Sequence, residues 1–182
     1  VDTIMQPLHR TLVRLAEMPQ PVIAALHGPV AGAGMSVAMA ADLAIAADDA
    51  KFTLAYARIG TSIDGSGSYH LPRLVGLRKA LEIALLADTI DAAEAQRLGL
   101  VNFVAPAAEL SERTATLAAR LATGPTLAYG AIKRLLRESL GRDLPGHLEA
   151  ERSAFHASMD TDDFAEGVGA FLGKRKPSFV GR

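Results

Sequence analysis

The chain has 182 residues, which is enough for one domain with a sizeable buried core. Its 19 basic and 20 acidic residues nearly cancel, so we expect no nucleic-acid partner. The lack of cysteine excludes disulfides, thiolate chemistry and cysteine metal sites, and it agrees with a cytoplasmic location.

The first part of the chain alternates between helix and strand patterns. Apolar residues spaced by three and four predict a helix over residues 3–17, which the prolines that follow it end. Capping-box spacing between Asp91 and Glu94 predicts a further helix, which Gly99 ends. The other predicted elements are strands at 22–26, 43–47, 51–54 and 100–104, helices at about 34–41 and 78–87, and a glycine-rich loop at 60–68.

After Pro106 the pattern is almost wholly helical. The predicted helices are 109–122, 126–140, 145–158 and 161–172. We therefore expect an α/β part at residues 1–105 and a helical region at 106–182. The weakly charged stretch 28–47 is rich in glycine and alanine, and it fits a buried loop, helix and strand better than a membrane span.

The most informative segment is residues 21–42, PVIAALHGPVAGAGMSVAMAAD. A strand runs into a loop with Gly28, Gly32 and Gly34 and then into a helix, so backbone N–H groups can face a ligand oxygen. No lysine follows Gly34, which argues against a phosphate-binding P-loop, and Val37 breaks the dinucleotide fingerprint. Two interpretations stay open, an anion-binding corner and a tight turn in which the glycines only relieve crowding.

Four segments in order resemble the enoyl-CoA hydratase/isomerase (crotonase) family. They are HGPVAGAGMSVAMAADLAIA, AKFTLAYARIGTSIDGSGSYHLPRLVG, DTIDAAEAQRLGLVNFV and DDFAEGVGAFLGKRKPSFVGR. The resemblance is greatest to the isomerase branch, which includes the ring-epoxide isomerases of phenylacetyl-CoA breakdown. It implies the α/β crotonase fold, a spiral of β/α units with a C-terminal helical layer that serves trimerisation and covers CoA.

The resemblance also implies partners and the extent of the chain. We expect an acyl-CoA thioester substrate, with coenzyme A as part of the substrate and no metal or redox cofactor. A homotrimer or hexamer is expected, and no membrane partner. The family pattern begins with further β/α units, one of which supplies the first oxyanion N–H group, and we expect these units to lie outside this chain.

By the resemblance, the Ala33 N–H is the second donor of an oxyanion hole, with Gly32 and Gly34 beside it in contact with substrate. Hydratases of the family use two glutamates, whose positions correspond here to Ser36 and Tyr56. Neither residue is a carboxylate, and an ordinary tyrosine has a pKa near 10. Water addition by paired carboxylates is therefore hard to assign to this chain.

Asp64 is the candidate acid and base. It is the one acidic residue between Asp49 and Glu82, and it lies where some isomerases of the family have a catalytic aspartate. A carboxylate beside an acyl pocket can take and return a proton. The competing interpretation is an ordinary turn, since Asp-Gly is a common turn pair.

The remaining candidate residues bind substrate. The resemblance assigns Tyr56 and Ile63 to the acyl pocket, and Phe171 and Lys174 to CoA, with Lys174 part of the basic run KRK. A solvated helix end explains that run equally well. The resulting expectation is isomerisation of a 3-enoyl-CoA to a 2-enoyl-CoA through an enolate. The alternatives are an enoyl-CoA hydratase with atypical catalytic residues and a non-catalytic CoA-binding relative.

Overall fold

The computed structural model describes residues 2–182, and their contacts divide into two compact units. The first unit contains residues 2–16 and 22–116, and the second contains residues 17–21 and 117–182. The division falls within α6 (Leu110–Ala122), whereas the sequence predicts a boundary at 105/106. The predicted boundary and the roles expected of the two parts stay predictions.

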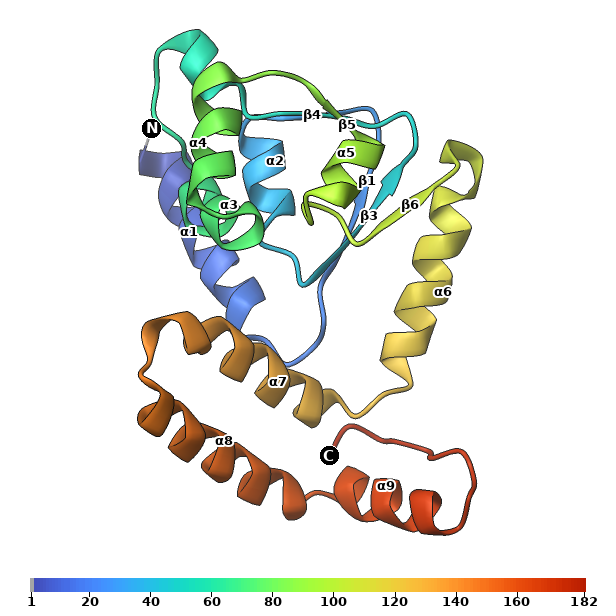
Figure 1. The fold of residues 1–182 in the computed structure, drawn as a ribbon. Coiled ribbons are helices and arrows are strands. Elements are labelled where there is room, and N and C mark those ends of the chain that lie inside the picture. Colours follow the sequence, from blue (N-terminus) through green and yellow to red (C-terminus); the bar gives the residue numbers. More distant parts are fainter. Residues whose placement is uncertain (1) are drawn as a thin grey trace. The chain divides into compact units, whose positions relative to one another are not determined.

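The first unit is an α/β assembly of short strands and helices (Figure 1). Its elements are α1 (Asp2–Glu17), β1 (Ile23–Leu26), β2 (Pro29–Ala31), α2 (Ala33–Ala38), β3 (Leu43–Ala47), β4 (Lys51–Thr53), a 3-10 helix (Ala55–Ile59), α3 (Gly67–Val75), α4 (Leu77–Leu86), β5 (Ile90–Asp91), α5 (Ala92–Arg97), β6 (Phe103–Ala105) and a second 3-10 helix (Ala107–Glu109).

The strands of the first unit form two three-stranded sheets. β3 is the central strand of a parallel sheet with the order β1-β3-β6, and Ile23 pairs with Leu43 at one end. The other sheet has the order β2-β4-β5, with β2 parallel and β5 antiparallel to β4. Most of β3 is fully buried, which explains its continuous apolar sequence LAIAA.

The predicted start and stop of α5 are confirmed. The Asp91 carboxylate accepts the Glu94 N–H at 2.8 Å, and Gly99 has a left-handed φ of 79°. The second half of a capping box is replaced, because the Glu94 carboxylate pairs with Arg97 at 2.5 Å. Local sequence chemistry is thus sufficient to define both ends of this short helix.

The predicted strand at 100–104 is wrong in its bounds. The N–H groups of Leu100 and Val101 both bond to the Ala95 carbonyl, at 2.9 and 3.4 Å, so these residues complete the last turn of α5. β6 therefore begins only at Phe103. Leu100 and Val101 are nevertheless buried in the core, which is why an apolar run covers both the turn and the strand.

Several elements were absent from the prediction, namely β2, α3, the two-residue β5 and the 3-10 helix at Ala55–Ile59. The first two show why. β2 lies inside the segment expected to be a glycine loop, and α3 contains Pro72, which weakens a helical pattern. Packing stabilises α3, since Leu71 is only 1% exposed and belongs to the main core of the unit. In both cases tertiary contacts override the local signal.

The second unit consists of helices and a return of the chain end. It contains α7 (Thr126–Glu138), a 3-10 helix (Ser139–Gly141), α8 (Leu144–Met159) and α9 (Asp162–Leu172). The predicted helices at 126–140, 145–158 and 161–172 are confirmed within two or three residues. Within this unit, the ammonium of the buried Lys133 donates to the carbonyls of Met18 and Gln20, both at 2.9 Å.

Candidate active site

The predicted glycine loop leads into α2 through Gly32, which has a left-handed φ of 51° that glycine adopts without strain. The Gly32 N–H donates to the Thr53 carbonyl at 3.0 Å, which holds the loop against β4. The first helical bond runs from the Ser36 N–H to the Gly32 carbonyl, so the N–H groups of Ala33 and Gly34 precede it. Both residues are exposed, so a ligand oxygen can reach their backbone.

Ser36, Tyr56 and Asp64 form one hydrogen-bonded group. Ser36 comes from α2, Tyr56 from the 3-10 helix that follows β4, and Asp64 from the loop before α3. The Tyr56 hydroxyl donates to Asp64 Oδ1 and lies 3.2 Å from Ser36 Oγ. Ser36 is fully buried and Tyr56 is 8% exposed, whereas Asp64 is half-buried. Of the two positions expected to correspond to the family glutamates, Tyr56 therefore contacts the candidate aspartate directly and Ser36 contacts Tyr56.

Two glycines let the Asp64 loop lie directly against α2. A Cβ on Gly67 would lie 2.4 Å from Ser36 Oγ and 2.8 Å from Ile63 Cγ2. A Cβ on Gly65 would lie 3.2 Å from Ser36 Cβ. Gly65 and Gly67 were not among the predicted site residues. The available signal was the spacing of small residues in DGSGS after Asp64.

Burial raises the pKa of the Tyr56 phenol above its ordinary value of 10.0, and its hydrogen bond to Asp64 raises it further. The phenol is therefore protonated at neutral pH, as a hydrogen-bond donor must be. A neutral phenol does not abstract a proton from water, so Tyr56 is unsuited to the general-base role of a glutamate. Asp64 is the carboxylate that this group presents to its surroundings.

The other predicted substrate residues are distributed between the units. Ile63 is half-buried and packs against the main core of the first unit. Phe171 and Lys174 belong to the second unit, where Phe171 is 82% exposed and accepts the Lys174 N–H on its carbonyl at 3.2 Å. The neighbouring Arg175 pairs with Glu166 at 2.6 Å. The CoA contacts of Phe171 and Lys174 stay predictions.

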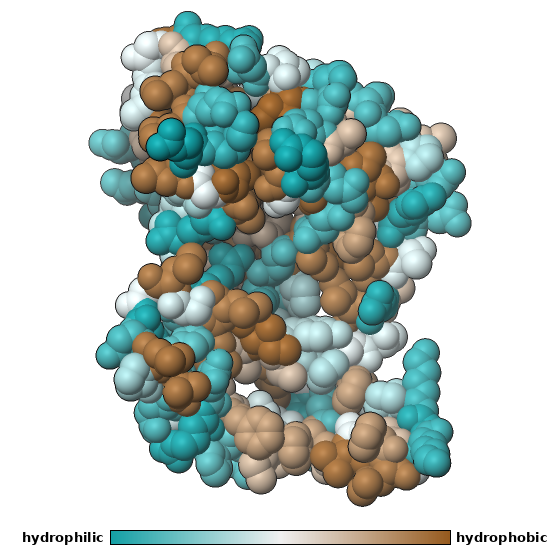
Figure 2. Space-filling model, in the orientation of Figure 1, coloured by the Kyte–Doolittle hydropathy of each residue, from teal (hydrophilic) through white to brown (hydrophobic). Residues whose placement is uncertain are grey.

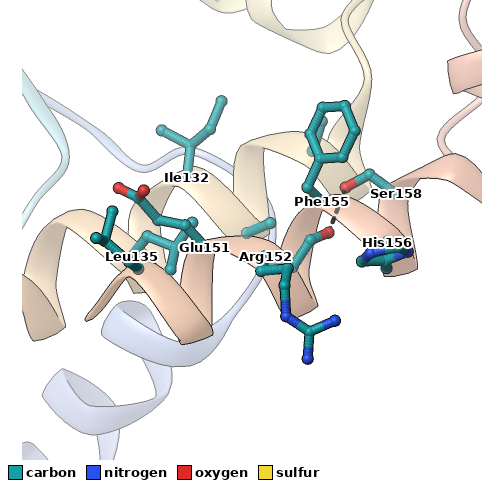
Figure 3. A pocket seen from close by; sticks show the side chains of 11 residues that line it. Ile132, Leu135, Glu151, Arg152, Phe155, His156 and Ser158 are labelled. Atoms are coloured by element: carbon teal, nitrogen blue, oxygen red, sulfur yellow. Dashed lines mark hydrogen bonds between the residues drawn. The ribbon is translucent and has the colours of Figure 1, made fainter. Parts of the chain in front are cut away.

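A groove of about 520 Å³ lies within the second unit, between α7 and α8 (Figure 3). Ile132 and Leu135 line it from α7, and Phe155 lines it from α8. The dashed line in the figure is the Ser158 hydroxyl bond to the Ala154 carbonyl, at 2.9 Å. Among residues 2–182, none of the predicted site residues lines this groove, so we do not assign the reaction to it.

Neither a metal site nor a membrane span is found in the part of the chain that the structure describes. Residues 2–182 contain no group of three or more histidine, aspartate or glutamate side chains arranged to hold an ion. Over the same residues, no helix has both the length and the apolar character needed to cross a membrane.

Comparison with known proteins gives the family. The sequence model of the enoyl-CoA hydratase/isomerase family matches residues 2–182. A probable enoyl-CoA hydratase from Rhodobacter capsulatus is 39% identical, over all of this chain and 71% of the relative. The 1,2-epoxyphenylacetyl-CoA isomerase of Escherichia coli is 37% identical, over all of this chain and 68% of its own length.

Solved structures show the same fold. The crystal structure of an enoyl-CoA hydratase from Polaromonas sp. JS666 matches with a TM-score of 0.92 at 36% identity, over 97% of this chain and 68% of that one. Both sequence and fold thus match along nearly the whole chain. The chain therefore belongs to the enoyl-CoA hydratase/isomerase (crotonase) family and has the α/β crotonase fold.

Proposed function

We propose that this member of the family is an acyl-CoA isomerase that converts a 3-enoyl-CoA into the conjugated 2-enoyl-CoA, with Asp64 as acid and base. The names of its relatives include both hydratase and isomerase. One observation carries the choice between them. Hydroxyl groups occupy the two glutamate positions, and the Tyr56 hydroxyl donates to Asp64, the carboxylate of the group.

In the proposed reaction, the thioester carbonyl lies against the N–H of Ala33. Asp64 takes a proton from C2, and the electron pair of that C–H bond moves into the thioester to form a dienolate. The negative charge on the thioester oxygen is stabilised by the N–H group. Protonated Asp64 then returns its proton to C4, and the electron pair of the C3–C4 double bond forms the new C4–H bond, which leaves the double bond between C2 and C3. Only a proton and electron pairs move, so the atoms balance without an oxidant or reductant.

The same residues do not support water addition by the family's paired carboxylates. That reaction needs one group to activate water and another to deliver a proton. Ser36 has a hydroxyl in place of a carboxylate, and burial raises the pKa of Tyr56, so neither residue supplies a carboxylate base. A ring-epoxide CoA thioester would use the same oxyanion stabilisation and is a second substrate to assay. Binding of substrate by Gly32, Gly34 and Ile63 belongs to the same proposal.

The test compares a 3-enoyl-CoA and a 2-enoyl-CoA with the wild-type protein and with Asp64→Asn. Absorbance of the conjugated thioester rises on isomerisation and falls on hydration. We expect a rise with the 3-enoyl substrate, reduced about 100-fold or more in Asp64→Asn, because positioned acid–base groups contribute about 10²–10⁴-fold.

Asp49→Asn is the matched control, since Asp49 is an exposed carboxylate in the turn after β3. It should retain the wild-type rate. Hydration of the 2-enoyl substrate at equal rates in wild type and Asp64→Asn would make the protein a hydratase with a different base. No reaction with either substrate or with a ring epoxide would support the non-catalytic alternative.

A further inference from the structure

The hydrogen bonds among Ser36, Tyr56 and Asp64 have a defined direction. A phenol has one O–H, and Tyr56 donates it to Asp64 Oδ1. The contact of 3.2 Å between Tyr56 and Ser36 can then be a hydrogen bond only if Ser36 Oγ is the donor. The protons therefore point from Ser36 to Tyr56 and from Tyr56 to Asp64.

The packing holds this chain of groups in place. Ser36 is fully buried, and the absent side chain of Gly67 leaves space that Ser36 Oγ and Ile63 fill. Tyr56 belongs to the core cluster that also contains Met35. Asp64 differs from its partners, because it is half-buried and lies in a loop without regular structure. Its bond to Tyr56 is therefore the contact that ties a loop carboxylate to a rigid group.

Tyr56 contacts one of the two oxygens of the Asp64 side chain. Within residues 2–182, Tyr56 is the hydrogen-bond partner of the Asp64 side chain and uses Oδ1. The side chain is also partly open to solvent. Because Tyr56 holds Oδ1, rotation of the carboxylate is restricted and the orientation of Oδ2 is fixed as well.

We propose that Tyr56 is a positioning residue for Asp64, holding Oδ1 so that Oδ2 faces the C2 proton of the bound thioester, while Ser36 orients the Tyr56 hydroxyl. This inference rests on the proposed acid–base role of Asp64. It assigns a reason to the two hydroxyl residues at the positions of the family glutamates. In place of two glutamates that transfer protons, the two hydroxyl residues hold Asp64, which transfers the proton.

A titration of the phenol tests the hydrogen bonds without any enzyme assay. The chain has three tyrosines, so phenolate absorbance is followed against pH, and Tyr56→Phe identifies the Tyr56 signal. Asp64→Asn should shift ionisation of Tyr56 to lower pH, because the carboxylate raises the pKa of the phenol. Ser36→Ala should shift it to higher pH, because a donated hydrogen bond from Ser36 lowers that pKa. Shifts of the same sign in both variants, or none, would overturn the proposed direction.

Kinetics test the positioning role. Tyr56→Phe should lower kcat about tenfold with KM little changed, because a hydrogen bond to a charged group is lost. Tyr69→Phe is the control, because Tyr69 is half-exposed in α3 and contacts Arg73 instead.

The outcomes separate the two proposals. Full activity in Asp64→Asn would overturn the proposed function, whatever Tyr56 does. Loss of activity in Asp64→Asn with an unchanged kcat in Tyr56→Phe would overturn the positioning role alone. If Tyr56→Phe does not fold, Ser36→Ala replaces it in the kinetics. A smaller loss of kcat is then expected, and an unchanged kcat would contradict the proposal.

Discussion

Ala33 shows how one backbone group can be tested through a side-chain change. It is the first residue of α2, the position in a helix where proline fits and where the N–H has no helical partner. Gly32 before it has no Cβ, which limits the steric conflict that proline causes with its predecessor. Ala33→Pro therefore removes the proposed oxyanion donor with little change in the helix.

We expect Ala33→Pro to lower kcat by about 100- to 1000-fold, the usual cost of one oxyanion donor. Ala33→Gly keeps the N–H and should retain most of the activity. The measurement is kcat with a 3-enoyl-CoA, together with thermal unfolding of both variants. Equal activity of the proline and glycine variants would show that the Ala33 N–H does not bind the thioester oxygen.

Gly67 lies where the Asp64 loop packs against Ser36 of the proposed site. Alanine at the start of a helix gains at most about 1 kcal/mol over glycine. Its Cβ would lie 2.4 Å from Ser36 Oγ and 2.8 Å from Ile63, so one of them must move. Such overpacking typically costs about 1–3 kcal/mol, and we expect it to outweigh the gain.

Denaturant unfolding of Gly67→Ala should therefore show a loss of about 1–3 kcal/mol, with reduced kcat because Ser36 supports Tyr56. Gly141→Ala is the matched control, since a Cβ there meets no atom within 4 Å. Its stability should change by no more than about 0.5 kcal/mol. An equally stable and active Gly67→Ala would mean that the loop tolerates a displacement from α2.

The elements differ in how far sequence predicts them. Long helices such as α1 and α8 are predicted nearly to their ends. A side-chain cap defines the start of the short α5. β2 and α3 fail because three-residue strands and a helix containing proline have weak local patterns and depend on packing. For the site, family positions identify Asp64, but the bond from Tyr56 depends on two segments meeting in space.

The contact between α9 and the chain end makes the stability of the protein depend on pH. Two bonds from Arg175 and one from the Ser178 N–H lower the pKa of Glu166 to about 2. A carboxylate with a lowered pKa in the folded state stabilises the protein above its unfolded pKa, and this contribution is lost as pH falls.

Glu166→Gln should therefore lower Tm at neutral pH, and its difference from wild type should narrow as pH falls from about 4.5 towards 2. Glu112→Gln, an exposed change in α6, is the control and should show little difference at any pH. A Glu166→Gln deficit that stays constant down to pH 3 would mean that the charge of Glu166 does not stabilise this end of the chain.

The whole molecule has many exposed apolar side chains. Figure 2 shows apolar surface on both units, and Leu136, Leu140 and Leu144 of the second unit are each 68% exposed or more. Large apolar patches on a soluble protein usually mark an interaction surface. Together with the family resemblance, this supports our expectation of a homotrimer or hexamer. Light scattering should give three or six times the chain mass, and a monomer at micromolar concentration would contradict it.

In the proposed reaction, Asp64 removes the C2 proton of an acyl-CoA thioester. The most direct measurement is departure of one deuterium from C2 of a 2,2-dideuterated 3-enoyl-CoA, with wild type and Asp64→Asn. It is followed at C2 by NMR, because a label that Asp64 delivers to C4 leaves the mass unchanged. We expect wild type to remove the label from C2 during turnover. Asp64→Asn should do so at least about 100-fold more slowly. Label loss at the wild-type rate in a folded Asp64→Asn protein would contradict the account.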